Sequence, residues 1–108
     1  MDAILVYITV ENQRQSELIS KILLEKRLAS CVNIVEGLHS MYWWEGQIQS
    51  TKEILLLVKT RKELFEKLCT EVQLLHSYQI PCIIALPIVA SHVDFMKWIW
   101  AETTDTTP

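Results

Sequence analysis

Three observations on the sequence predict an α+β fold in a single domain. Runs of apolar and β-branched residues with the length of strands alternate with segments whose apolar residues recur at helical spacing. Residues that typically cap helices precede these helical segments, and a glycine-containing turn separates two long strand-like runs. The chain has 108 residues, of which 50% are hydrophobic, so it can form the core of one domain without disulfide bonds.

The first strand and the first helix are expected over residues 3–9 and 13–29. The run AILVYIT is apolar and rich in β-branched residues, which is typical of a buried strand. Asn12 followed by Gln15 resembles a capping box, in which two residues satisfy free N–H groups at a helix start. The charged residues at 25–27 indicate that the helix ends soon afterwards.

A long hairpin is expected next. Residues 31–44 are predicted to form one strand, bent at Gly37, and residues 48–59 to form the returning strand. Glu45 and Gly46 are expected to make a two-residue turn, because glycine tolerates the positive φ that such turns need.

A second helix is expected over residues 61–75, since Thr60 and Glu63 form the T-x-x-E pattern of a capping box. After a loop at 76–81, the last elements are a strand at 82–89, a short amphipathic helix to residue 102, and a disordered tail at 103–108. Pro87 indicates either an edge strand or a bulge at 82–89.

The expected order is β-α-β-β-α-β with a C-terminal helix, a split βαβ arrangement that predicts a ferredoxin-like sandwich over residues 1–102. In such a fold the two main helices cover one face of an antiparallel sheet, and the other face normally alternates to polar residues. Here three strands are apolar on both faces, around residues 3–9, 54–58 and 82–89. We therefore expect the second face to pack against other copies of the chain.

The length of the hairpin also indicates a homo-oligomer. Residues 31–44 would extend about 45 Å as a strand, against a diameter of roughly 35 Å for a compact domain of this size. Its end carries Tyr42, Trp43 and Trp44, and an unsupported aromatic edge would aggregate. These three residues are expected to pack at the interface between subunits.

Composition excludes several classes of protein. The formal net charge of −3 argues against nucleic acids and anionic membranes as partners. The N-terminal apolar run is too short for a transmembrane helix and has no basic segment before it, unlike a signal peptide. The chain has an odd number of cysteines, and they are widely spaced, at Cys31, Cys69 and Cys82. This pattern predicts that no set of disulfide bonds forms and that the protein is cytoplasmic.

Four segments of the sequence resemble the CutA family of divalent-cation-tolerance proteins. They are LASCVNIVEGLHSMYWWEGQI, Glu53 with ILLLVKT, HSYQIPCIIALPI, and DFMKW, in the family's order and spacing. The resemblance implies a ferredoxin-like fold and a PII-like homotrimer whose sheets face inward and whose hairpins embrace their neighbours. It also implies a part in tolerance of copper and other divalent ions, and no catalytic activity is established as common to the family.

The chain departs from the family pattern in the loop after the second helix. Ser77 replaces a proline, and Gln79 and Cys82 replace acidic residues. The positions of the copper ligands of some members are occupied here by Ile8, Leu75 and His76, so only one of those ligands remains. The resemblance therefore does not carry that copper site over to this chain.

The candidate ligand cleft is expected between subunits, near Lys59, His76, Tyr78 and Cys82. His76 and Cys82 are the candidate metal ligands, because an imidazole and a thiolate suit copper(I) or zinc. A third ligand would have to come from a neighbouring subunit or a small molecule. The alternatives are that His76 only bonds backbone groups at the helix end and that Lys59 is simply solvated.

Other functions remain as rivals to this hypothesis of a non-enzymatic binding protein. A trimeric scaffold that presents surfaces to a partner would need no small ligand. An acyl phosphatase of the same fold would need an anion-binding loop after the first strand, and residues 10–13 contain no glycine. An RNA-binding module would need aromatic side chains on the open sheet face, and no common enzyme motif such as GxSxG, a P-loop or HExxH is present.

Overall fold

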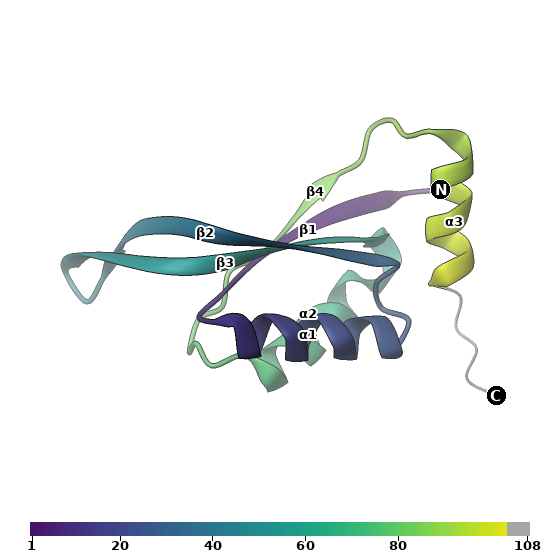
Figure 1. Ribbon diagram of the computed structural model, residues 1–108. Helices are drawn as coiled ribbons and strands as arrows, with labels where there is room; N and C mark the ends of the chain where they lie inside the picture. The colour runs from purple at the N-terminus through teal and green to yellow at the C-terminus, as the bar shows by residue number, and fades with distance from the viewer. Residues whose placement is uncertain (104–108) are drawn as a thin grey trace.

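A single antiparallel sheet with helices on one face forms the protein, which confirms the predicted α+β class. The computed structural model describes residues 1–103, and its strands are ordered β2-β3-β1-β4 (Figure 1). In chain order the elements are β1 (Ala3–Val10), α1 (Gln13–Glu25), β2 (Cys31–Trp44), β3 (Gln47–Arg61), the 3-10 turn η1 (Lys62–Leu64), α2 (Phe65–Leu75), β4 (Ile83–Pro87) and α3 (Val93–Glu102). Helices α1 and α2 lie side by side below the sheet, and α3 lies at one end of it, near the N-terminus.

The core lies between the sheet and the pair α1 and α2. Alternate residues of β1 point into it, because successive side chains of a strand face opposite sides of a sheet. The buried apolar residues of this core are Ile4, Val6, Ile8 and Val10 of β1, Leu56 and Val58 of β3, Ile19 and Leu23 of α1, and Leu68 and Val72 of α2.

Helix α1 begins as predicted but ends earlier than residue 29. The Asn12 side chain accepts a hydrogen bond from the Gln15 backbone N–H at 2.9 Å, which confirms the N-cap. At the other end, Leu28 N donates to Leu23 O at 2.9 Å and Arg27 N donates to Leu24 O at 3.1 Å. These two bonds form a Schellman motif, which ends the helix.

The predicted capping box at Thr60 and Glu63 is wrong. Thr60 pairs with Ile4 inside the sheet, so its backbone is extended, and its side chain is fully buried facing the core. Strand β3 continues to Arg61, η1 follows, and α2 begins at Phe65 with no side-chain cap. The tertiary pairing of β3 with β1 prevails over the local sequence signal.

The β2–β3 hairpin has the predicted length, bend and turn. Its strands pair from Cys31 to Trp44, interrupted by a bulge between Val35 and Leu38 that contains Gly37 at φ 82°. Glu45 and Gly46 close the hairpin with φ of 50° and 78°, as a turn with two positive φ angles requires. The hairpin projects beyond the helices in Figure 1, and the molecule measures 44 Å along its longest axis.

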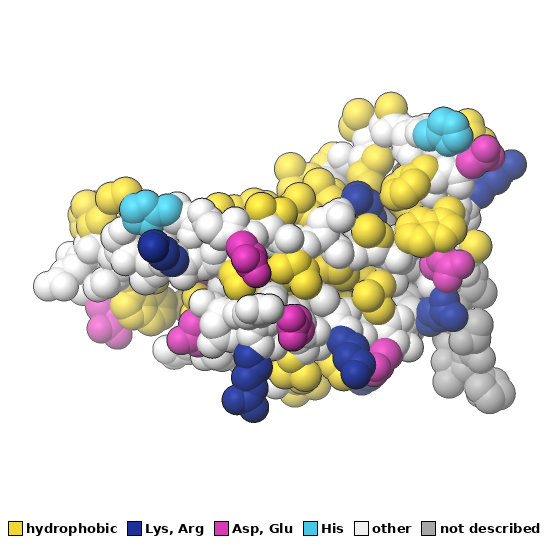
Figure 2. Space-filling view, viewed as in Figure 1, with side chains coloured by type: hydrophobic (Ala, Val, Ile, Leu, Met, Phe, Trp, Pro, Cys, Tyr) yellow, Lys and Arg dark blue, Asp and Glu magenta, His cyan; other side chains and the backbone are white. Residues whose placement is uncertain are grey.

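The sheet face opposite the helices is also apolar, as the two-sided apolar strands predicted. We call it the open face. The large apolar residues on it are Leu5 and Tyr7 of β1, Val35 of β2, Leu55 and Leu57 of β3, and Ile84 and Leu86 of β4. Ile84 is 54% exposed and Leu86 46% exposed, and hydrophobic side chains gather along the upper side of the sheet in Figure 2. An apolar face of this kind is typical of an interface.

The C-terminal helix is held to the end of β3 by one arginine. Arg61 donates from Nε to Thr103 Oγ1 at 2.8 Å and from a guanidinium nitrogen to Trp100 O at 2.6 Å. Thr103 is 3% exposed, and the remainder of the expected tail, residues 104–108, lies outside the described residues. None of the helices within residues 1–103 is long and apolar enough to cross a membrane.

Candidate functional site

The loop between α2 and β4 brings three of the predicted site residues to one end of the sheet. His76 and Tyr78 lie in this loop and Cys82 stands just before β4. They meet the end of β1 at Thr9 and the middle of β3 at Glu53. We call this group the Glu53 cluster.

Both ring nitrogens of His76 are engaged with the backbone. Nε2 lies 2.8 Å from Thr9 O, and Nδ1 accepts a hydrogen bond from Tyr78 N at 3.0 Å. Because Nδ1 accepts, it carries no proton, and Nε2–H is then the donor to the Thr9 carbonyl of a neutral imidazole. His76 thus clamps the loop onto β1, and it could bind a metal ion only if one of these hydrogen bonds broke.

Tyr78 and Glu53 form the polar centre of the cluster. The Tyr78 hydroxyl donates to Glu53 Oε2 at 2.9 Å, and the Tyr78 ring lies 4.7 Å from the ring of His76. Burial, followed by the hydrogen bond to Glu53 and its negative charge, raises the pKa of the Tyr78 phenol. The phenol therefore stays protonated as a hydrogen-bond donor at neutral pH.

Glu53 has acceptor capacity that its surroundings do not use. The residue is only 7% exposed, and within residues 1–103 its carboxylate receives one side-chain hydrogen bond, from Tyr78. An ionised carboxylate has about four acceptor positions. A buried carboxylate with a single neutral partner is a candidate binding position for a cation or for a group with several N–H donors.

Sequence reasoning did not assign Glu53 a role, although one signal was available. In the register of β3, Glu53 falls on the same side of the strand as Leu55 and Leu57. A charged residue that continues an apolar strand face is unusual and indicates a polar site at the edge of that face. The partner Tyr78 lies 25 residues away, so only the fold joins the two.

Cys82 is a thiol rather than a thiolate in this setting. Burial is the largest cause that raises its pKa, the charge of Glu53 adds to it, and a hydrogen bond with Thr9 opposes them. A metal ion would have to displace this proton, because the thiolate is the ligand form of cysteine.

Ser77 makes contacts that the family's proline could not make. Its backbone N–H donates to Gln15 Oε1 at 3.0 Å, a bond that a proline at this position would lack. Its hydroxyl donates to Glu11 Oε2 at 2.9 Å. Gln15 also donates to Leu75 O at 3.0 Å, so this side chain joins α1 to the end of α2 and to the start of the loop.

Lys59 lies away from the cluster within one subunit. It follows Glu53 by six positions along β3, which corresponds to about 20 Å of strand. Its ammonium donates to Asn33 Oδ1 at 2.8 Å, lies 3.9 Å from Cys31 Sγ, and lies 5.7 Å from the centre of the Phe95 ring. A single chain therefore does not bring Lys59 together with His76, Tyr78 and Cys82.

No complete metal site is formed by the described part of one chain. Among residues 1–103, no group of three or more histidine, cysteine, aspartate or glutamate side chains is placed to hold a metal ion. Tyr42, Trp43 and Trp44 of the hairpin are 41%, 72% and 39% exposed. Trp43 and Trp44 pair with Ile48 and Gln47 at the hairpin end. Tyr42 lies nearer the cluster, since its hydroxyl accepts from Thr51 Oγ1 at 3.5 Å and its charge adds to the rise in the pKa of Tyr78.

Comparisons with known proteins agree on one family. The family described as "CutA1 divalent ion tolerance protein" matches residues 4–102. A divalent-cation tolerance protein CutA from Archaeoglobus fulgidus is 46% identical over 94 residues, which cover 87% of this chain and 91% of that protein. A CutA protein of Thermus thermophilus is 45% identical over 98 residues, which cover 91% of this chain and 95% of that protein.

Solved structures of relatives have the same fold. The crystal structure of CutA1 from Oryza sativa is 38% identical, has a TM-score of 0.94, and covers 98% of this chain and 97% of that one. The chain spans 59% and 56% of the chloroplastic CutA proteins of Oryza sativa and Arabidopsis thaliana. A structure from Archaeoglobus fulgidus with a TM-score of 0.92 is described as periplasmic, so relatives occur in different compartments. By its sequence and by its fold, this chain belongs to the CutA1 divalent ion tolerance family.

Proposed function

We propose that this protein is a homotrimeric, non-catalytic binding protein that acts in the response to divalent metal ions. Its ligand would be cationic or rich in N–H donors and would bind at the Glu53 cluster. The observation that carries the proposal is the buried Glu53 carboxylate, whose single hydrogen-bond donor is Tyr78 within the described residues. Membership of a divalent-ion tolerance family supports the same class of ligand.

Assembly would complete this site. Glu53 lies at the edge of the open face, and burial of the exposed Ile84 and Leu86 of that face would favour assembly. A second subunit placed on that face would bring its own groups to the cluster. In this arrangement Lys59 of one subunit can approach the cluster of another, as the sequence predicted for an inter-subunit cleft.

The specific ligand that we propose is a copper or zinc ion. Glu53 and Cys82 supply an oxygen and a sulfur donor in the same cluster, and a neighbouring subunit would supply the third. His76 would join them only by giving up its bond to Thr9 or to Tyr78. Glu53 is therefore a better candidate ligand than His76.

Calorimetric titration with Cu²⁺ and Zn²⁺ tests this form of the proposal. We expect the wild-type protein to bind one of the ions with a Kd below about 1 mM, and Glu53→Gln to weaken binding at least tenfold. The substitution keeps the shape of the side chain and the acceptor for Tyr78 but removes the charge. His76→Ala and Cys82→Ser, titrated alongside, show which of these two residues contributes.

The matched control is Glu25→Gln. Glu25 is an exposed glutamate on α1 whose ion pair within residues 1–103 is with Lys21, at 3.9 Å, so its loss should leave ion affinity unchanged. If the wild-type protein binds neither ion with a Kd below the millimolar range, the proposal that it binds copper or zinc is wrong. If wild type and Glu53→Gln bind the ion with equal affinity, the Glu53 cluster is not the binding site.

A scaffold that presents a surface to another protein is the second candidate. The exposed side chains at the hairpin end favour it, since Trp43 is 72% exposed and Met41 69% exposed. If Trp43 stays accessible to a small fluorescence quencher such as acrylamide in the assembled protein, the hairpin end is free for a partner. We propose a reducing, cytoplasmic setting for either function, because Cys31, Cys69 and Cys82 are free thiols.

A further inference from the structure

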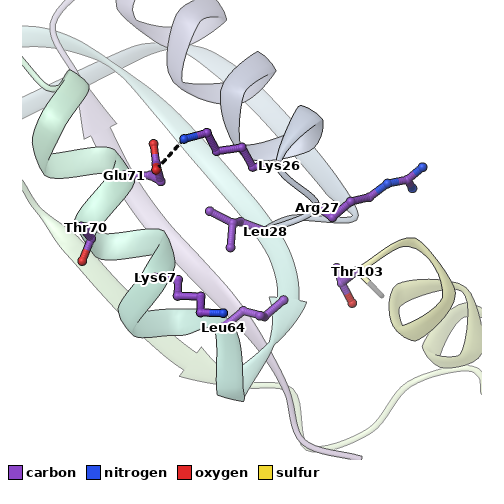
Figure 3. A pocket seen from close by; sticks show the side chains of 8 residues that line it. All are labelled: Lys26, Arg27, Leu28, Leu64, Lys67, Thr70, Glu71 and Thr103. Carbon is purple, nitrogen blue, oxygen red and sulfur yellow. Dashed lines mark hydrogen bonds and ion pairs between the residues drawn. The ribbon is translucent and has the colours of Figure 1, made fainter. Parts of the chain in front are cut away.

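A cavity of about 450 Å³ opens on the helical side of the molecule, away from the Glu53 cluster. It lies between the end of α1, the first turns of α2 and Thr103 (Figure 3). Its volume is within the range of roughly 300–1,000 Å³ that is typical of small-molecule sites. Because it lies on the opposite side from the open face, assembly through that face would leave it accessible.

The lining combines an apolar part with an excess of positive charge. Leu28 and Leu64 form the apolar part, and Figure 3 shows Leu28 directed into the hollow. The charged residues of the lining are Lys26, Arg27, Lys67 and Glu71, so three positive charges less one negative charge leave +2. The whole chain has a net charge of −3, so the sign of the cavity is opposite to that of the protein.

Two of the three cations that line the cavity form ion pairs with carboxylates of the protein, and the third does not. Lys26 pairs with Glu71 at 2.7 Å, and Arg27 pairs with Glu102 at 2.8 Å. Within residues 1–103, Lys67 has no hydrogen bond or ion pair to another side chain. An ammonium beside apolar surface with no carboxylate of its own is suited to an anion.

The backbone at Arg27 is left-handed and leads directly into Leu28 on the apolar wall of the cavity. Arg27 has φ of 58°, the left-handed conformation that glycine usually adopts at this position of a Schellman motif. Leu28 follows and is fixed by its bond to Leu23 O, which leaves it 7% exposed.

We propose that this cavity binds a small molecule with an anionic head on a short apolar body. The head, a carboxylate or a phosphate monoester, bonds Lys67. The body lies on Leu28 and Leu64. Lys26 and Arg27 stand at the rim, where their side chains are 52% and 46% exposed and can exchange their carboxylate partners for the ligand.

A methyl NMR titration of the full chain tests the proposal with three probes. Hexanoate and hexyl phosphate carry the two anionic heads, and 1-hexanol carries the same body without charge. We expect at least one of the two anions to shift the methyl signals of Leu28 and Leu64 saturably, and 1-hexanol to bind at least tenfold more weakly. The stronger anion identifies the head group. Absence of a saturable shift with both anions, or equal affinity for 1-hexanol, would overturn the proposal.

Two substitutions locate the site. Lys67→Gln should weaken binding of the better anion about tenfold, since one charge-assisted hydrogen bond is lost. Lys21→Gln is the matched control on α1, because Lys21 is exposed and outside the cavity. Arg27→Gly should weaken binding while its melting temperature stays at or above that of the wild type, because the strain is relieved. Unchanged affinity in Lys67→Gln, or an equal loss in Lys21→Gln, would show that the anion does not bind here.

Discussion

At the scale of single residues, the pair Tyr78 and Glu53 connects the loop after α2 to the middle of β3. The phenol gives a buried carboxylate its single side-chain donor among the described residues, at 2.9 Å. His76 fixes the backbone that carries this phenol, through its bonds to Thr9 and Tyr78. Two neighbouring side chains therefore have separate tasks, since His76 positions the loop and Tyr78 contacts the site.

Replacement of Tyr78 by phenylalanine should lower the free energy of unfolding at pH 7 by about 2 kcal/mol, because a hydrogen bond to a charged, buried group is lost. Urea unfolding at one fixed subunit concentration measures this difference. Tyr7→Phe is the control, because the Tyr7 hydroxyl has no hydrogen bond to another side chain within residues 1–103. Equal effects of the two substitutions would contradict the role of the pair.

The same pair gives stability a dependence on high pH. Because burial and Glu53 raise the pKa of Tyr78 in the folded state, the unfolded chain releases this proton first. The contribution of Tyr78 is complete below the unfolded pKa of about 10 and decreases as pH rises towards the folded pKa. We expect the difference in unfolding free energy between wild type and Tyr78→Phe to shrink above about pH 10. A constant difference would show that the phenol titrates normally.

At the scale of elements, two helix starts with similar sequence signals have different structures. Asn12 precedes α1 on an exposed stretch of chain, and its side chain caps the helix. Thr60 belongs to β3 and is paired with β1, so its hydroxyl is buried and has no hydrogen-bond partner. Removal of the polar side-chain group should therefore lower the free energy of unfolding at Asn12 and raise it at Thr60.

Asn12→Ala should lower the free energy of unfolding by about 1 kcal/mol, the usual value for loss of an N-cap. Thermal or urea unfolding measures it, and Asn12→Asp, which retains the accepting oxygen, should preserve stability. If alanine and aspartate had the same effect, the cap would make no contribution.

Thr60→Val should raise the free energy of unfolding by about 1 kcal/mol, because a methyl group replaces a buried hydroxyl without a partner at nearly the same volume. Urea unfolding at fixed subunit concentration measures the gain. A capping role for Thr60 predicts the opposite sign, so a loss of stability would restore the interpretation made from the sequence.

At the scale of the whole molecule, the apolar open face and the projecting hairpin predict that several copies of the chain assemble into a homotrimer. Light scattering on a gel-filtration peak should give about 38 kDa, three times the chain mass of 12.6 kDa. Leu86→Glu places a charge on the open face and should reduce this mass. Leu74→Glu is the matched control on α2, because Leu74 is 75% exposed on the helical side. A wild-type peak with the mass of one chain would exclude the trimer.

The sequence by itself determined the fold class, the hairpin and the family, because these depend on periodicity, turn residues and local segments. The loop residues His76, Tyr78 and Cys82 were identified for the same reason, since they are close together in the chain. Only the tertiary structure decided what each of them contacts. It gave His76 two backbone partners and placed Lys59 elsewhere on β3.

It also joined Glu53 to Tyr78 and made Thr60 part of the sheet rather than a helix cap. The physical reason is the same in each case. Strand register and long-range hydrogen bonds join residues that are far apart in the chain, and such pairings leave no pattern in the local sequence.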